Sequence, residues 1–291
     1  MSAAEVLHSH QKDLGGGFVV RRLLPAAAKQ AVGPFIFFDH FGPIEVPPHA
    51  DHDVRPHPHI GLATVTYLFE GAMEHRDSVG SVQRIEPGAV NWMTAGSGIV
   101  HSERTPKDLA GRARRTHGLQ LWAALPLEHE EAPPGFSHTP AAALPQATVG
   151  AAQVKVLIGS AFGMVSPVRT YSPTLYLDVC LGAGQPLRLT DLPPEAAIYP
   201  VGGALEVDGV ALAEHAMLLL ERGAPALVRA RDGANARFVV IGGEPIGHRF
   251  IFWNFVSSSK ERIARAADDW SAQRFDRVPG ETEFIPLPRR P

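Results

Sequence analysis

The sequence predicts an all-β fold, a barrel or sandwich, arranged in two domains with few helices. Glycine and proline account for 28 and 26 of the 291 residues and interrupt the chain at short intervals. The apolar runs between them have the length and composition of strands, and sustained helical periodicity is missing from most of the chain. A chain of this length forms one large domain or two of ordinary size, and we expect two.

Strand candidates follow one another closely in the first half of the chain. We expect strands at 60–69, 82–85 and 90–94, the last two joined by a turn at Pro87-Gly88. Gly96 and Gly98 predict a tight turn that leads into a further strand from residue 99.

Two spaced doublets lie in these predicted strands, His57-Pro58-His59 and His101-Ser102-Glu103. Residues i and i+2 of a strand face the same side, so each doublet can direct both of its side chains into one cavity. Three imidazoles and one carboxylate suit iron, manganese, nickel, copper or zinc, and four ligands leave positions open on a six-coordinate metal. Because thiolates are missing from the set, we expect Fe(II), with Mn, Ni, Cu and Zn as alternatives.

The second half repeats the strand pattern without the doublets. We place the domain boundary between residues 135 and 136, where the composition shifts to Pro, Ala, Glu and His, giving domains 1–135 and 136–291. The segment YLFEGAME at 67–74 has an echo in YPVGGALE at 199–206, which predicts a duplicated domain. Later histidines, His215 and His248, stand alone, so the second domain should lack a metal site. Further strands are expected at 154–158, 175–181, 217–220 and 238–241.

One helix is expected near the C-terminus. Ser258 and Glu261 form a candidate capping box, and Ile263, Ala267 and Trp270 make an apolar stripe at helical spacing. The helix should therefore pack on a barrel.

Other candidate site residues are assigned less specific roles. His40, His49 and His52 fall in a proline-rich loop, where a solvated or mouth-lining role is expected, not ligation. His75 is a candidate for supporting the ligands or lining the pocket, and a structural role fits equally well. Cys180, the single cysteine, is expected to be a buried, unreactive thiol.

Composition excludes several classes of protein. The formal net charge of −3 offers no basic surface for direct nucleic-acid binding. Met1–Lys12 lacks an apolar signal core and no apolar run approaches the roughly 20 residues that span a bilayer, so no membrane association is expected. A single cysteine precludes an intrachain disulfide, and we expect a cytoplasmic protein.

Three segments closely resemble the pirin signature: HPHIGLATVTYL from His57, HRDS from His75 and PGAVNWMTAGSGIVHSE from Pro87 to Glu103. The resemblance continues more loosely through GLQLW at 118–122 and GGEP at 242–245. It implies a bicupin, two tandem cupin (double-stranded β-helix, or jelly-roll) barrels with metal, usually iron, in the N-terminal barrel alone. It also implies that His57, His59, His101 and Glu103 are the metal ligands. The acidic residue that the general cupin pattern has shortly after HxH is absent, since Ala63 and Thr64 stand there.

The resemblance implies a quercetin 2,3-dioxygenase (quercetinase) type of oxidoreductase, in which a flavonol and dioxygen meet at an open Fe(II) site. Glu103 is then also a candidate base for the flavonol hydroxyl. The alternative is a non-catalytic, redox-sensing metalloprotein that binds a transcription factor or a metabolic enzyme. A third is an inert cupin holding scavenged metal. Family precedent implies a monomer, and the physiological substrate stays open.

Overall fold

The computed structural model describes residues 5–14, 18–50, 52–231 and 233–289. They form two compact units, each built from separate stretches of chain. We call the unit of residues 12–20, 40–138 and 246–291 the N-terminal barrel, and the unit of residues 5–11, 21–39 and 139–245 the C-terminal barrel. The sequence predicted one boundary at 135/136. Packing instead assigns the C-terminal segment, which begins at Ile246, to the N-terminal barrel. Such an exchange of segments leaves no trace in composition.

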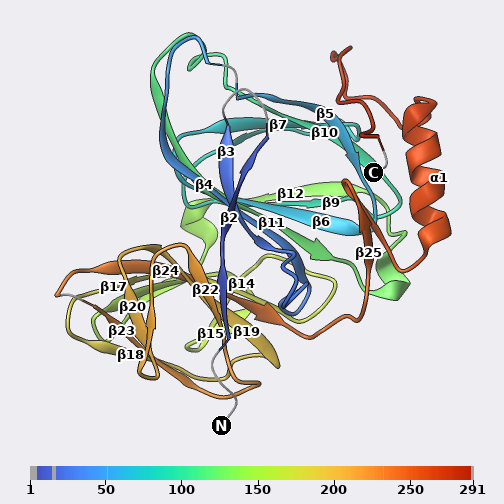
Figure 1. Ribbon diagram of the computed structural model, residues 1–291. Coiled ribbons are helices and arrows are strands. Elements are labelled where there is room, and N and C mark those ends of the chain that lie inside the picture. Colours follow the sequence, from blue (N-terminus) through green and yellow to red (C-terminus); the bar gives the residue numbers. More distant parts are fainter. Residues whose placement is uncertain (1–4, 15–17, 51, 232, 290–291) are drawn as a thin grey trace. The chain divides into compact units, whose positions relative to one another are not determined.

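The N-terminal barrel has a seven-stranded and a four-stranded sheet (Figure 1). The larger sheet has the order β12 (Gly135–Thr139), β9 (Val90–Thr94), β6 (Leu62–Glu70), β11 (Arg114–Ala124), β4 (Phe35–Val46), β3 (Val19–Leu24) and β2 (His10–Asp13). The smaller sheet has the order β5 (Val54–His59), β10 (Ile99–Arg104), β7 (Met73–Asp77) and β8 (Val82–Ile85). Strand β3 begins in the N-terminal barrel and belongs to the C-terminal barrel from residue 21 onward. Strand β4 begins in the C-terminal barrel and belongs to the N-terminal barrel from residue 40 onward.

The C-terminal barrel repeats this strand order. Its larger sheet runs β1 (Val6–His8), β22 (Ala216–Leu219), β19 (Glu195–Gly202), β24 (Ala236–Gly243), β17 (Thr174–Leu181), β14 (Ala152–Ile158) and β13 (Gln146–Val149). Its smaller sheet runs β18 (Pro186–Leu189), β23 (Ala226–Ala230), β20 (Leu205–Val207) and β21 (Val210–Leu212). Alternating side chains from both sheets meet in one apolar core, among them Val154, Leu177, Leu189, Val228 and Phe238.

The remaining short elements connect or cover these sheets. They are the 3₁₀ turns η1 (Leu127–His129) and η2 (Ala141–Ala143) and the two-stranded ribbons β15 (Ser160–Ala161) with β16 (Met164–Val165) and β25 (Phe250–Phe252) with β26 (Phe255–Ser257). None of the described helices is long and apolar enough to cross a bilayer.

The repeated sequence segments occupy matching turns in the two barrels. Gly71 joins β6 to β7 with φ +87°, and Gly203 joins β19 to β20 with φ +79°. A Cβ atom would stand 2.5 Å from the Arg115 carbonyl oxygen at Gly71 and 2.7 Å from the Asn235 carbonyl oxygen at Gly203. Both turns therefore require glycine, for its positive φ and for the close backbone approach. The common strand order and the common turn support a duplicated barrel.

The predicted helix is present as α1 (Lys260–Ser271), and it packs on the N-terminal barrel. Ile263, Ala267 and Trp270 are buried as the apolar spacing predicted. The predicted cap was wrong by one residue: Ser259 is the N-cap, and its Oγ accepts the Arg262 N–H at 3.2 Å. Ser258 is engaged elsewhere, because its N–H and its hydroxyl donate to the Glu130 carboxylate.

Candidate metal centre

Both histidine doublets lie on neighbouring strands of the smaller sheet, as predicted. Strands β5 and β10 are antiparallel, and His57 is directly opposite His101. His59 follows two residues later on β5, so all three imidazoles extend from the same face. Their ligand nitrogens lie within 4.8 Å of one another, and the Nε2 atoms of His59 and His101 are 3.1 Å apart. All three side chains are buried. This cluster has the geometry of a site that can hold one metal ion.

The environment keeps these imidazoles neutral, which is the form that binds metals. Burial lowers the pKa of His57 to about 4 and brings the pKa values of His59 and His101 well below their usual range. His57 Nδ1 lies 2.9 Å from the Arg55 carbonyl oxygen, which can only accept a hydrogen bond. Nδ1 of His57 must therefore carry the proton, and its Nε2 lone pair is left for a metal. The donor set fits a divalent ion of the first transition row.

Glu103 lies on the same strand two residues beyond His101, but it is not part of the cluster that the three histidines form among the described residues. The register of β10 against β5 shifts between His101 and Glu103, which pairs Glu103 with Val54. The Glu103 residue keeps some solvent exposure, yet burial of its carboxyl group raises the pKa to about 7. A carboxyl group with that pKa exchanges protons readily near neutral pH.

A third doublet, His75-Arg76-Asp77, lies on β7, the strand next to β10 and its doublet. His75 and Asp77 are both buried, and His75 Nε2 is 2.9 Å from Asp77 Oδ2. The opposite nitrogen, His75 Nδ1, is 3.4 Å from His101 Nδ1. The His75 ring also stacks on Phe136, with centroids 4.2 Å apart. The i, i+2 spacing of His75 and Asp77 is the same signal that identified the ligand doublets, but sequence reasoning gave Asp77 no role.

Trp122 contributes an apolar wall to the cluster. It lies on β11 in the larger sheet, buried, and its ring meets the His59 ring edge-on with centroids 5.2 Å apart. A flat aromatic side chain beside a metal site favours an apolar or aromatic ligand over a small charged one.

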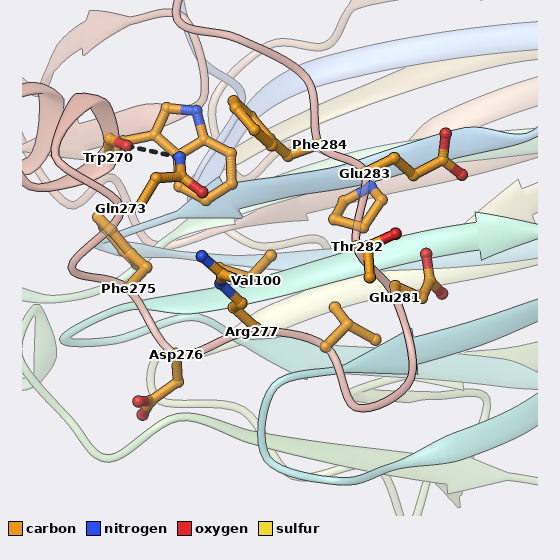
Figure 2. A pocket seen from close by; sticks show the side chains of 12 residues that line it. Val100, Trp270, Gln273, Phe275, Asp276, Arg277, Glu281, Thr282, Glu283 and Phe284 are labelled. Atoms are coloured by element: carbon orange, nitrogen blue, oxygen red, sulfur yellow. Dashed lines mark hydrogen bonds between the residues drawn. The ribbon is translucent and has the colours of Figure 1, made fainter.

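A pocket on the opposite face of β5 and β10 is too small for such a ligand. Figure 2 shows Val100 with Trp270, Phe275 and Phe284 of the C-terminal segment around it. Val100 alternates with His101 along β10, so it faces away from the histidine cluster. The hollow measures roughly 20 Å³, which is room for about one water molecule.

The other histidines are placed partly as expected. His49 and His52 lie outside the strands, whereas His40 lies on β4, fully buried, with its Nε2 atom 2.8 Å from His117 Nε2. The expected loop position of His40 was therefore wrong, because strand β4 continues through Gly42 and Pro43 as far as Val46. His215 lies outside the three-histidine cluster, in contact with Tyr199.

The expectation that Cys180 is buried was also wrong. It lies on β17, as predicted, but faces outward and is exposed. Partial desolvation and the neighbouring Asp178 charge raise the pKa of its thiol, so it stays protonated near neutral pH. The thiol is a poor nucleophile for this reason and not because it is buried.

Comparison with known proteins gives matches over both barrels. The family model named Pirin matches residues 17–123, and the model of the pirin C-terminal cupin domain matches residues 176–276. A pirin-like protein of Caulobacter vibrioides is 47% identical over 288 residues, covering 97% of this chain and 98% of its own. A Pseudomonas aeruginosa protein provisionally named a quercetin 2,3-dioxygenase is 40% identical over 270 residues, covering 91% of this chain and 84% of its own. The crystal structure of quercetin 2,3-dioxygenase from Acinetobacter baumannii has a TM-score of 0.91 at 33% identity, with 99% of this chain and 96% of that chain covered.

Proposed function

The chain belongs to the pirin family, and from that premise we propose that it is a metal-dependent dioxygenase of the quercetin 2,3-dioxygenase type, which opens flavonols at an iron(II) site. The observation that carries this proposal is the buried cluster of three neutral histidines, with Glu103 next on the same strand face. The names of two similar proteins, from Pseudomonas aeruginosa and Acinetobacter baumannii, support the reaction class.

Each residue of the site has a distinct role in this proposal. His57, His59 and His101 would hold the ion, and Glu103 would complete the set with a carboxylate oxygen. Iron(II) bound there would bring the flavonol and dioxygen together, and both oxygen atoms of dioxygen would enter the products. Trp122 would face the flavonol rings. Glu103 would also be the candidate base for the flavonol hydroxyl, and a bound cation would keep it ionised by lowering its pKa below the metal-free value of about 7.

The test uses protein isolated without a chelating tag, loaded with Fe(II) under argon and then mixed with quercetin and dioxygen. We expect loss of the flavonol absorbance, and ¹⁸O₂ should label the products with both oxygen atoms. His57→Ala should abolish turnover, and Glu103→Gln should reduce kcat by about 10²–10⁴-fold if the carboxylate acts as the base.

His138→Gln serves as the matched control. His138 lies in the same barrel on β12, partly buried against Asn91 and outside the cluster, so this variant should keep wild-type turnover. Absence of turnover by the iron-loaded wild type, or full activity of His57→Ala, would contradict the proposal. A partner protein bound by the ferric form alone would then favour the regulatory alternative.

A further inference from the structure

The third doublet is aligned with the ligands by strand register. On β7, Asp77 is directly opposite His101, and His75 is directly opposite Glu103. Residues paired across an antiparallel ladder share a face, so His75 and Asp77 extend from the same face of the smaller sheet as the ligand cluster. The contact of His75 with His101 is therefore a diagonal one, because His75 lies two residues along β7 from Asp77, the residue opposite His101.

The direction of the hydrogen bonds follows from the carboxylate. The pKa of Asp77 is lowered, because hydrogen bonds from His75 and Ser81 outweigh the effect of burial, so this group is an anion and can only accept. Its Oδ1 atom already accepts the backbone N–H groups of Val79 and Ser81, at 3.1 and 2.8 Å. Oδ2 is left for His75, whose Nε2 must carry the proton. When the ring carries a single proton, on Nε2, its Nδ1 is an acceptor.

The same reasoning decides which ring nitrogen of His101 carries the proton. If His75 Nδ1 accepts, then His101 Nδ1 is the donor across the 3.4 Å contact. The lone pair of His101 is thereby left on Nε2, the nitrogen that faces His59. A metal requires that lone pair.

The C-terminal barrel shows that the fold does not require this polar pair. When the two barrels are aligned on the Gly71 and Gly203 turns, Val207 takes the place of His75, and it is buried in an apolar core. The counterpart of Asp77 is Gly209, beyond the end of β20. Strand β7 thus extends two residues further than β20, and Asp77 stands at that extension.

We propose that His75 is a positioning residue for the metal site: anchored by Asp77, it holds His101 in the Nδ1–H tautomer and directs the Nε2 lone pair of His101 at the ion. This inference rests on the metal-binding part of the proposed function and not on the identity of the substrate. A hydrogen bond from the far nitrogen of a ligand imidazole also strengthens it as a donor, and losing such a partner typically weakens metal affinity by about 10–100-fold.

The first measurement needs no variant. Long-range ¹H–¹⁵N spectra of uniformly labelled protein distinguish the two imidazole tautomers, in the metal-free protein and in the Zn(II)-loaded, diamagnetic form. We expect His75 as the Nε2–H tautomer and His101 as the Nδ1–H tautomer. A His75 ring protonated on Nδ1 would overturn the proposal, whether or not any metal binds.

The second measurement breaks the hydrogen-bond chain at its far end. In Asp77→Asn the amide oxygen can still accept from Val79 and Ser81, which turns the NH₂ group toward His75 Nε2 and reverses every donor in the chain. His75→Phe removes the chain but keeps the stacking on Phe136. Each variant should bind Co(II) about 10–100-fold more weakly than the wild type, by chelator competition. The double variant should be no weaker than the worse single one, because both act through His101.

His117→Gln is the matched control, since it alters another histidine pair of the same barrel, His40 with His117, outside the ligand cluster. It should change thermal stability and leave Co(II) affinity within about twofold. Additive losses in the double variant, or unchanged affinity in folded Asp77→Asn, would contradict the proposal. If the variants lose Co(II) affinity as expected while iron-loaded wild type leaves quercetin intact, the proposed reaction is wrong and the positioning role of His75 is supported.

Discussion

The two barrels share one strand order but differ in what fills the space beside the smaller sheet. Register pairs His57 with His101 and Glu103 with His75 in the N-terminal barrel, and Leu189 with Ala226 and Val228 with Val207 in the C-terminal barrel. Those four C-terminal residues are buried in a continuous apolar core. The same scaffold therefore packs well with aliphatic side chains where the other copy holds imidazoles and a carboxyl group.

This difference indicates that the buried polar groups of the N-terminal barrel are not needed for folding. Burying a polar group without full compensation costs about 1–3 kcal/mol in proteins, and the aliphatic barrel avoids that cost. Stability therefore does not explain the buried imidazoles of His57, His59 and His101, whereas the proposed metal site does. The predictions below exchange features between the barrels.

The largest effect is expected when a ligand is replaced by its counterpart. His57→Leu copies Leu189 and removes one of three imidazoles, so metal affinity should fall well beyond the roughly 10–100-fold typical of a residue behind the ligands. The metal-free variant should unfold at a denaturant midpoint close to that of the metal-free wild type, since leucine suits this position in the other barrel. Metal analysis and urea denaturation measure the two quantities. Retained stoichiometric metal would contradict the ligand assignment.

The reverse exchange should destabilise the protein. Leu189→His places an imidazole in the apolar core of the C-terminal barrel, without partners arranged for it, and should lower the free energy of unfolding by about 2–4 kcal/mol. The variant should gain no second metal. Equal stability of wild type and variant in urea would show that this core tolerates polar groups and would weaken the contrast between the barrels.

The third effect is a pH dependence of stability that arises in the N-terminal barrel. The pKa of His57 is about 4 when folded and near 6.5 when unfolded, so the unfolded chain binds more protons between these values. Metal-free stability should therefore fall as pH drops from about 6.5 to 4, by about 3 kcal/mol from His57 alone.

Glu103 acts in the opposite sense. Its folded pKa of about 7 exceeds the usual 4.5, so its contribution is present at low pH and lost as pH rises through 7. Glu103→Gln should remove this opposing term and steepen the rise in stability from pH 5 to pH 7. Denaturation series at these pH values test the sign, and an unchanged slope would argue that the carboxyl group is well solvated.

The smallest effect concerns the feature that the barrels share. Gly71→Ala and Gly203→Ala each force a positive φ on alanine and a clash with a backbone oxygen, so each should cost about 1–3 kcal/mol. Gly80→Ala is the control, because Gly80 also has a positive φ, +92°, but no heavy atom within 4 Å of an added Cβ. It should cost only the conformational part, about 1 kcal/mol. A cost at Gly71 no greater than at Gly80 would show that the turn can shift.

Much of this was readable in the sequence because strands have a period of two. The i, i+2 spacing placed His57 and His59 on one face of a strand, and His101 and Glu103 on one face of another. Strands β8 and β9 begin and end where the Pro87-Gly88 turn predicted. The exchange of segments between units was not readable, since it depends on long-range packing. The partner of Ser258 was hidden for the same reason, because Glu130 is distant in the chain. Asp77 was overlooked because its role appears only when β7 is placed against β10.

Anomalous X-ray diffraction at the iron edge, from crystals of tag-free, iron-loaded protein, tests the central claim most directly. One peak per chain is expected among the imidazoles of His57, His59 and His101, with the Glu103 carboxylate turned toward it and no peak near Leu189 or Val228. Iron bound elsewhere in the chain, or no ordered iron at the histidine cluster of protein that contains one iron per chain, would contradict the account.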